Sequence, residues 1–282
     1  MTVHTHVRTL NGESLTEEQF KKFVPSVYAG EAHESRSDRY TYIPTIDILR
    51  EMYRHGFQPV EARQARTRTA GKRDFTKHMV KLRHKDRAFI VGDIIPEITL
   101  VNAHDGSSSY EFFGGLFRPI CTNGMVASEG FAASVRIPHK GDVLDDVIDG
   151  SFTVLGETQR LTDFADQTRR IRMSQDDIRE YGNLALKVMG KEKELNWSQV
   201  TSPRRAGDGQ ANLWHVFQRT QENAIKGGLL AQVEKEVVSR GRRVVIPATR
   251  STRAVNGIDG NIDLNQKLWG LTVEFAKMKE LA

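Results

Sequence analysis

The sequence predicts an α+β fold with an N-terminal helical segment, a mostly antiparallel sheet over about 57–137, and a helical C-terminal half. Three observations lead to this class. Residues 57–137 alternate apolar with polar side chains and are rich in β-branched residues, as strands are. Turn dipeptides interrupt that stretch, and after residue 139 apolar residues recur at helical spacing. The turn dipeptides are Gly71-Lys72, Asp105-Gly106, Gly114-Gly115 and Asn123-Gly124.

The first elements are predicted from apolar spacing and terminal residues. A short helix is expected over about 16–23. A second helix follows Pro44, with Thr45 as its cap and Gly56 as its end. The sheet should hold five or six strands, and Asn123-Gly124 is its strongest hairpin turn.

The C-terminal half is predicted to be helical with two loops. Ser174 and Asp177 resemble a capping box, and Gly227-Gly228 ends a later helix. The last helix carries a continuous apolar stripe over 264–278. Residues 207–209 and 239–261 are expected to form loops.

The 282 residues are predicted to form one domain behind an arm. Residues 1–35 are polar and irregular, so we expect a loosely packed N-terminal arm. Residues 36–282 then form a single α+β domain, sheet-rich over 36–140 and helix-rich over 141–282.

The composition excludes several classes of protein. Hydrophobic residues make up 38% and charged residues 27% of the chain, as in ordinary globular proteins. No run approaches the roughly 18 apolar residues of a membrane helix, and the N-terminus lacks the apolar region of a signal peptide. The single cysteine, Cys121, excludes a disulfide framework and a multi-cysteine zinc site. We therefore expect a cytoplasmic protein with no membrane partner.

The positive charge of the chain is concentrated in one segment. The formal net charge is +5, with 41 basic and 36 acidic residues. Ten lysines and arginines lie between Arg63 and Arg87, opposed only by Asp74 and Asp86, so this segment is net +8. The rest of the chain is net −3. A segment of this kind favours a polyanionic partner.

The basic segment is interpreted as a β-hairpin with one cationic face. As a helix, Phe75, Met79 and Leu82 would share a stripe, but a strand separates charge from Val80 and Leu82 better. The hairpin would gather cations in one groove-sized area, where phosphates bind and Phe75 supports a base by stacking. The alternative is a solvated face that protects an edge strand. The cations of that area are Arg66, Arg68, Lys77, Lys81 and Arg83.

Further cations are expected to assist. Ser202-Pro203-Arg204-Arg205 and Thr249-Arg250-Ser251-Thr252-Arg253 combine hydroxyls with guanidinium groups, which suit phosphates, although solvation explains both equally well. The predicted nucleic-acid-binding residues are Arg63, Arg66, Arg68, Lys72, Arg73, Phe75, Lys77, Lys81, Arg83, Arg118, Arg204, Arg205, Arg250 and Arg253.

Motifs for catalysis are largely absent. The sequence contains no phosphate-binding loop, dinucleotide fingerprint, zinc-protease helix or nucleophile elbow, so no cofactor is expected. The nearest cluster is the Asn102–Asp105 loop, where His104 and Asp105 are weak candidates for a metal or a base. A simple turn explains that loop better, because Asp-Gly is a turn signature. Cys121 is interpreted as a structural thiol.

Three groups of residues carry a resemblance. The first is Pro96-Glu97-Ile98 with Asn102-x-His104-Asp105-Gly106, where Ala103 replaces the usual Ser. The second is Gly115-Leu116-Phe117-Arg118 with Cys121-Thr122-Asn123-Gly124. The third is Leu213-Trp214-x-x-Phe217-x-x-x-Gln221-Glu222-Asn223 with Gly227-Gly228, Thr252-Arg253-Ala254-Val255 and Asn265-x-x-Leu268-Trp269. From about residue 35 onward the chain resembles the "phage/plasmid-like protein" family, a domain of unknown function carried by prophages, phages and plasmids. The resemblance implies a mobile-element protein and supplies no catalytic residues.

The order of elements is also similar to that of the ring-forming single-strand annealing recombinases. Those proteins hold single-stranded DNA in a basic groove and use neither nucleotide nor nucleophile. The leading hypothesis is therefore a non-enzymatic nucleic-acid-binding protein of a mobile element, acting in single-stranded DNA binding or annealing, and a homo-oligomer is compatible with it. One alternative is a metal-dependent nuclease or nucleotide hydrolase centred on the Asn102–Asp105 loop. Another is a protein-binding antagonist of host defence.

Overall fold

The computed structural model divides the chain into two compact units, residues 1–163 and 164–282. The boundary falls inside the long helix α3 (Val143–Arg170). The structure describes residues 5–9, 13–30, 44–69, 71–86, 94–105, 108–119, 123–126, 134–137, 143–239 and 242–280.

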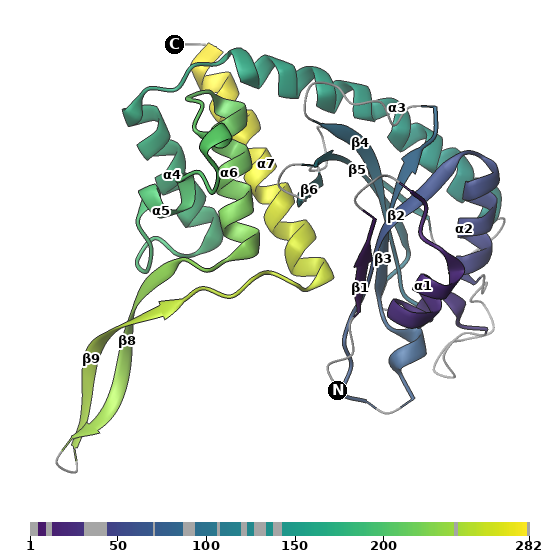
Figure 1. The fold of residues 1–282 in the computed structure, drawn as a ribbon, viewed down its shortest axis with the longest axis horizontal. Helices are drawn as coiled ribbons and strands as arrows, with labels where there is room; N and C mark the ends of the chain where they lie inside the picture. The colour runs from purple at the N-terminus through teal and green to yellow at the C-terminus, as the bar shows by residue number, and fades with distance from the viewer. Residues whose placement is uncertain are drawn as a thin grey trace. The chain divides into compact units, whose positions relative to one another are not determined.

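The first unit is built on an antiparallel sheet of seven strands (Figure 1). Six of them follow one another in the order β1-β2-β3-β4-β5-β6. Strands β6 and β7 share one edge of β5, where β6 pairs with residues 115–118 and β7 with residues 110–113. The strands are β1 (His6–Arg8), β2 (Phe57–Gln64), β3 (His78–His84), β4 (Ile95–Asn102), β5 (Tyr110–Arg118), β6 (Asn123–Val126) and β7 (Ser134–Ile137). The predicted α+β class and the basic hairpin, formed by β2 and β3, are confirmed.

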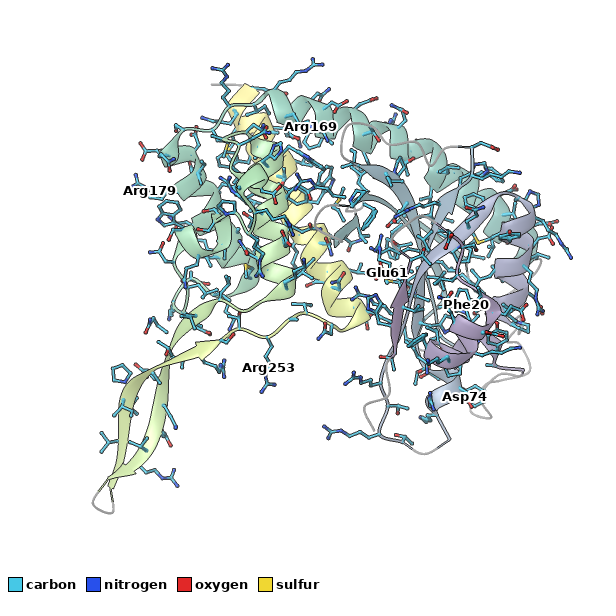
Figure 2. All side chains as sticks on the ribbon, viewed as in Figure 1. Phe20, Glu61, Asp74, Arg169, Arg179 and Arg253 are labelled. Atoms are coloured by element: carbon cyan, nitrogen blue, oxygen red, sulfur yellow. The ribbon has the colours of Figure 1, made fainter. Side chains whose placement is uncertain are left out.

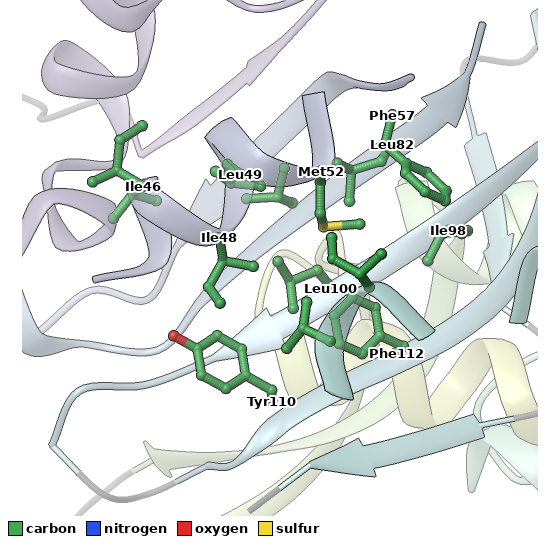
Figure 3. Close-up of a cluster of buried hydrophobic side chains, with 14 of the residues drawn as sticks. Ile46, Ile48, Leu49, Met52, Phe57, Leu82, Ile98, Leu100, Tyr110 and Phe112 are labelled. Carbon is green, nitrogen blue, oxygen red and sulfur yellow. The ribbon is translucent and has the colours of Figure 1, made fainter. Parts of the chain in front are cut away.

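Alternate residues of the strands build a hydrophobic core on one face of the sheet. Ala62, Val80, Leu100 and Phe112 are successive partners across four strands, so they form one continuous apolar row. Helices α1 (Glu17–Phe23), α2 (Thr45–Arg54) and the start of α3 contribute the other side of this core (Figure 3). The amphipathic pattern of α2 follows directly, because Ile48, Leu49 and Met52 of one face are fully buried there.

The N-terminal arm is packed, where the sequence suggested a loose segment. Thr16 caps α1 with a complete capping box, and Phe20 and Val24 lie in the core of the sheet. Strand β1 adds to the edge of the sheet beside β2. The prediction of loose packing is wrong for these residues because a few apolar side chains are enough to dock a short helix.

Two predicted turns lie inside strands. Gly114 and Gly115 pair with β4 in the middle of β5. Asn123 and Gly124 pair with Arg118 and Phe117 as part of β6, so the connection between β5 and β6 precedes them. A Cβ on Gly115 would stand 2.2 Å from the backbone oxygen of Met125, which explains the glycine without any turn.

The second unit packs helices around α6 and extends a two-stranded ribbon from them (Figure 1). Residues 213–224 of α6 are all buried, and Trp214 and Trp269 are fully enclosed. The helices are α4 (Gln175–Met189), α5 (Trp197–Thr201), α6 (Leu213–Lys226) and α7 (Ile258–Glu280). The ribbon consists of β8 (Leu230–Ser239) and β9 (Arg242–Ser251), and α7 begins at Ile258. The prediction of a loop over 239–261 is therefore wrong for Ser239, 242–251 and 258–261, and correct for 252–257.

Candidate nucleic-acid interface

Four exposed cations of the basic segment lie on the loop between β2 and β3. Arg66, Arg68, Lys72 and Arg73 are exposed, and none of them forms an ion pair within the described residues. The one acidic residue of the loop, Asp74, is exposed as well (Figure 2). We call residues 65–77 the basic loop. It presents a local excess of positive charge that is not neutralised internally.

Buried groups hold both ends of the basic loop. Ala65 donates a backbone hydrogen bond to the carbonyl of Lys77 at 2.8 Å, which closes the loop. The Gln64 side chain donates to the Arg73 carbonyl at 2.7 Å and accepts from the Ser26 backbone at 3.1 Å. Gly71, at φ +77°, allows the reversal that Lys72 and Arg73 follow. The cations therefore project from a fixed backbone.

Phe75 and Lys77 lie at the edge of this surface. Both are half-buried, and the Phe75 carbonyl accepts a 3.1 Å hydrogen bond from the backbone of His104. The sequence-predicted stacking residue is thus anchored on the sheet beside the exposed cations.

The cations of the basic segment that lie on β3, Lys81 and Arg83, are buried. Only about 5% of the Lys81 and Arg83 side chains is exposed. Arg83 donates to Glu97 at 2.7 and 3.0 Å, and Lys81 lies 3.7 Å from Glu61. The solvent-facing cationic face predicted for the hairpin is therefore not formed at these two positions, because acids of β2 and β4 pair with them in the interior.

Arg8 of β1 completes this buried ion cluster. It contacts Glu61 and donates to Glu97 at 2.9 Å, and its guanidinium lies 3.6 Å above the centre of the Phe117 ring. Arg63 also donates to Glu61, at 2.8 Å. We call Arg8, Glu61, Lys81, Arg83 and Glu97 the buried ion cluster (Figure 2 labels Glu61).

Electrostatics in the buried ion cluster favour the charged carboxylate. Burial alone would raise the pKa of Glu61, but the cations of Lys81, Arg63 and Arg8 and a hydrogen bond from His6 hold this pKa well below its ordinary value. Burial lowers the pKa of Lys81, against the attraction of Glu61 and Glu97. The sequence shows neither effect because the partners come from four different strands.

The predicted cations elsewhere in the chain fall into two groups. Arg118 is buried in β5. Arg204 donates to Asn223 at 2.6 Å and to the carbonyl of Gly227. Arg205 pairs with Asp208 and Glu222, which raises its pKa. Arg118 is therefore enclosed, and the guanidinium groups of Arg204 and Arg205 are already bonded within the second unit.

Arg250 and Arg253 behave differently. Both are exposed, and their side chains form no hydrogen bond or ion pair with the residues that the structure describes. They lie at the base of the ribbon, where Arg250 is the penultimate residue of β9 and Arg253 follows the strand (Figure 2 labels Arg253). They remain available to a ligand of the second unit.

The Asn102–Asp105 loop takes part in a buried polar network on the core face of the sheet. The Thr45 hydroxyl lies 2.9 Å from Nε2 of His78 and 3.0 Å from Nε2 of His104, and Asn102 donates to it at 3.1 Å. Ser26 Oγ lies 3.0 Å from Nδ1 of His78. Thr45 therefore does not cap α2, as the sequence suggested; its hydroxyl joins two histidines instead.

This network is closed to solvent. Thr45, His78, His104 and Asn102 are fully buried, and burial lowers the pKa of His78 to about 4.

Among the described residues, no three His, Cys, Asp or Glu side chains are placed to hold a metal ion. Cys121 lies outside the described residues. No described helix has the length and apolar character needed to cross a membrane.

Sequence reasoning missed Arg8, Glu97 and Gln64. Each acts through a partner distant in the chain, such as Glu97, which is 14 residues from Arg83 and 89 from Arg8. The one available signal was the presence of Glu61 and Glu97 in otherwise strand-like stretches, where an isolated buried carboxylate requires a cation.

Comparisons with known proteins agree with the resemblance noted from the sequence. A family model described as "Domain of unknown function (DUF932)" matches residues 32–269. Two proteins of Escherichia coli (strain K12), UPF0380 protein YafZ and UPF0380 protein YfjQ, are each 44% identical over 257 residues, or 90% of this chain and 89% of each relative. No solved structure matches the chain. With a family model matching most of its length, this chain belongs to the DUF932 family.

Proposed function

We propose that this protein binds nucleic acid through the basic loop, without chemical turnover, in the binding or annealing of single-stranded DNA of a mobile element. The observation that carries the proposal is the set of four exposed cations without ion-pair partners on one fixed loop. Other described cations are paired with acids of their own unit, as Arg50 is with Glu17 and Arg205 with Glu222. Cations left without acids are those that can release counterions from a phosphate backbone.

Single strands suit this loop better than duplex. Phe75 stands beside the cations, and aromatic side chains support unstacked bases in sequence-tolerant binding. The cations reach phosphates, which position a strand without reading its sequence. The mobile-element context rests on the resemblance to the phage and plasmid family. The described contacts favour neither the hydrolase nor the host-defence alternative.

The test is the salt dependence of binding to a labelled single strand, measured by fluorescence anisotropy. The variant R66A/R68A/K72A/R73A should flatten the slope of log K against log salt by about 3 units, at roughly 0.7 for each phosphate contact. The control R160A/R179A/K267A/K277A removes as many exposed cations, each paired with an acid on its own helix. It should leave the slope unchanged.

Three outcomes would contradict the proposal. An equal loss of slope in both variants would mean that only net charge matters. An unchanged slope in the variant R66A/R68A/K72A/R73A would mean that the basic loop does not contact the strand. Annealing of complementary strands is scored in the same samples, with duplex DNA as a competitor. Preferential binding of duplex would contradict the single-strand form of the proposal.

A further inference from the structure

A hollow of about 380 Å³ lies at the base of the ribbon, entirely within the second unit. Arg250, Arg253 and Lys191 contribute its charged lining, and Met189, Val255 and Leu264 its apolar lining. Small-molecule sites typically combine an apolar wall with a few placed polar groups, and have volumes of roughly 300–1,000 Å³. The hollow is therefore large enough for one small ligand.

Hydrogen bonds to the end of α6 fix the backbone that carries these arginines. Gly228 donates to the Thr252 carbonyl at 2.9 Å, Thr252 donates to Leu229 at 2.8 Å, and Val255 donates to Ile225 at 2.8 Å. Gly227 makes this close approach possible. It has φ +62°, and a Cβ there would stand 2.7 Å from the Arg253 carbonyl. The segment after β9 is thus held against α6, and the hollow keeps its shape.

The charge of the hollow is positive and largely unsatisfied. Lys191 is held by Glu194 at 2.8 Å, which offsets part of its charge. Arg250 and Arg253 make no such bond with the described residues. Arginines that merely complement a helix C-terminus hydrogen-bond its carbonyls, as Arg204 does with Gly227, and these two do not.

One face of the ribbon continues from the lining of the hollow. None of the described side chains on this face is acidic. Paired residues of an antiparallel ribbon share a face, so Lys235 and Ile246 lie on the same face as Arg250 and Ala231. Ala231 belongs to an apolar cluster against which Met189 packs, and Met189 and Arg250 both line the hollow, which places this face on the side of the hollow. The opposite face carries Glu234, Glu236 and Arg243.

We propose that the hollow binds one nucleotide unit, with its phosphate on Arg250 and Arg253 and its base against Met189, Val255 and Leu264. Guanidinium groups suit phosphate oxygens, and the aliphatic side chains of the wall offer apolar contact to a base. The unit is either a free nucleotide or one residue of a strand. The strand form rests on the proposed function, whereas the free form does not.

The test is titration of the full chain with a deoxynucleoside monophosphate and with inorganic phosphate by calorimetry, and with the labelled single strand by anisotropy. The variant R250A/R253A should weaken nucleotide binding by about tenfold or more, because charge-assisted hydrogen bonds are lost. The control R243A/R179A removes one arginine from the opposite ribbon face and one from α4. It should bind as the wild type does.

The outcomes separate the two sources and the two proposals. If the wild type binds the monophosphate and R250A/R253A does not, the ligand is a free nucleotide. If the wild type does not bind the monophosphate and R250A/R253A loses affinity for the strand, the ligand is one residue of a strand. If the wild type binds the monophosphate but not the single strand, this inference holds and the proposed function is refuted. Phosphate binding as tight as nucleotide binding would overturn the role of the apolar wall. No binding of the nucleotide and unaltered strand affinity in R250A/R253A would overturn the inference as a whole.

Discussion

The hydrogen bonds around Thr45 determine the protonation state of His78. The Thr76 carbonyl lies 3.2 Å from Nδ1 of His78 and can only accept, so Nδ1 carries the proton. Nε2 must then accept from the Thr45 hydroxyl at 2.9 Å. Having donated its one proton, Thr45 accepts from His104 and Asn102. If His78 took up a second proton, Nε2 would become a donor, and the Thr45 hydroxyl would have no free lone pair to accept from it.

This arrangement predicts acid sensitivity. In the unfolded chain His78 binds a proton near pH 6.5, whereas in the folded chain the pKa of His78 is about 4. The unfolded state therefore binds more protons between these values, and the free energy of unfolding falls by roughly 3 kcal/mol as pH drops through that window. Urea unfolding at several pH values should show a shallower fall for H78Q than for wild type. Substitution of the exposed His55 by Gln should leave the fall unchanged, and an equal fall in H78Q would contradict the assignment.

The buried ion cluster predicts a large difference between two carboxylates. E61Q removes the charge that Arg8, Arg63 and Lys81 share, so it should destabilise the fold by about 3 kcal/mol or more. E17Q removes an exposed carboxylate paired with Arg50, and it should lower the free energy of unfolding far less because exposed ion pairs contribute little. Urea unfolding of both variants measures the contrast. Similar losses in both would show that the cluster is not buried as described.

At the scale of elements, Gly115 is required by the approach of two strands. A Cβ at this position would meet the Met125 backbone, so G115A should force β5 and β6 apart and destabilise the protein by about 2 kcal/mol or more. Gly156 in α3 has open space around its Cβ position, and G156A should stabilise the helix by about 0.5–1 kcal/mol. Thermal unfolding of the pair gives opposite signs if this packing is correct. A destabilised G156A or a neutral G115A would argue against it.

Local patterns predicted elements well and their environments poorly. Alternation around Val80 and Leu82 identified β3, and Ser174 with Asp177 identified the start of α4, because both signals lie within a few residues. Nothing local shows that Lys81 is buried, since its partner Glu61 comes from another strand and is itself contacted by Arg8 of a third strand. A strand alternation gives two faces but not which one is covered.

The ribbon was missed for a related reason. A loop was expected over 239–261, although Val244-Val245-Ile246 is a strand-like run. Pro247 is tolerated because each strand of a two-stranded ribbon has one unpaired edge, where a missing N–H costs nothing. The same reasoning applies to Gly114-Gly115, where a turn signature marks close packing inside a strand.

At the scale of the whole molecule, the structure redistributes the positive charge that the sequence concentrates in one segment. Lys81 and Arg83 are neutralised internally by Glu61 and Glu97. Lys85 is exposed beyond the end of β3 that lies away from the basic loop. The net +8 of residues 63–87 therefore does not form one exposed patch. The basic loop retains four freely exposed cations.

The salt dependence of strand binding should follow the exposed cations and not the composition. At roughly 0.7 per phosphate contact, the basic loop alone gives a slope near 3, and Arg250 with Arg253 would raise it to about 4. All ten basic residues of the segment would give about 7. Measuring the wild-type slope for a single strand distinguishes these values without any substitution. A slope near 7 would mean that binding opens the buried ion cluster and releases Lys81 and Arg83 to phosphates, so the stability contributed by Glu61 would be lost in the complex. A slope of 3 to 4 would keep that cluster intact and place the interaction on the surface.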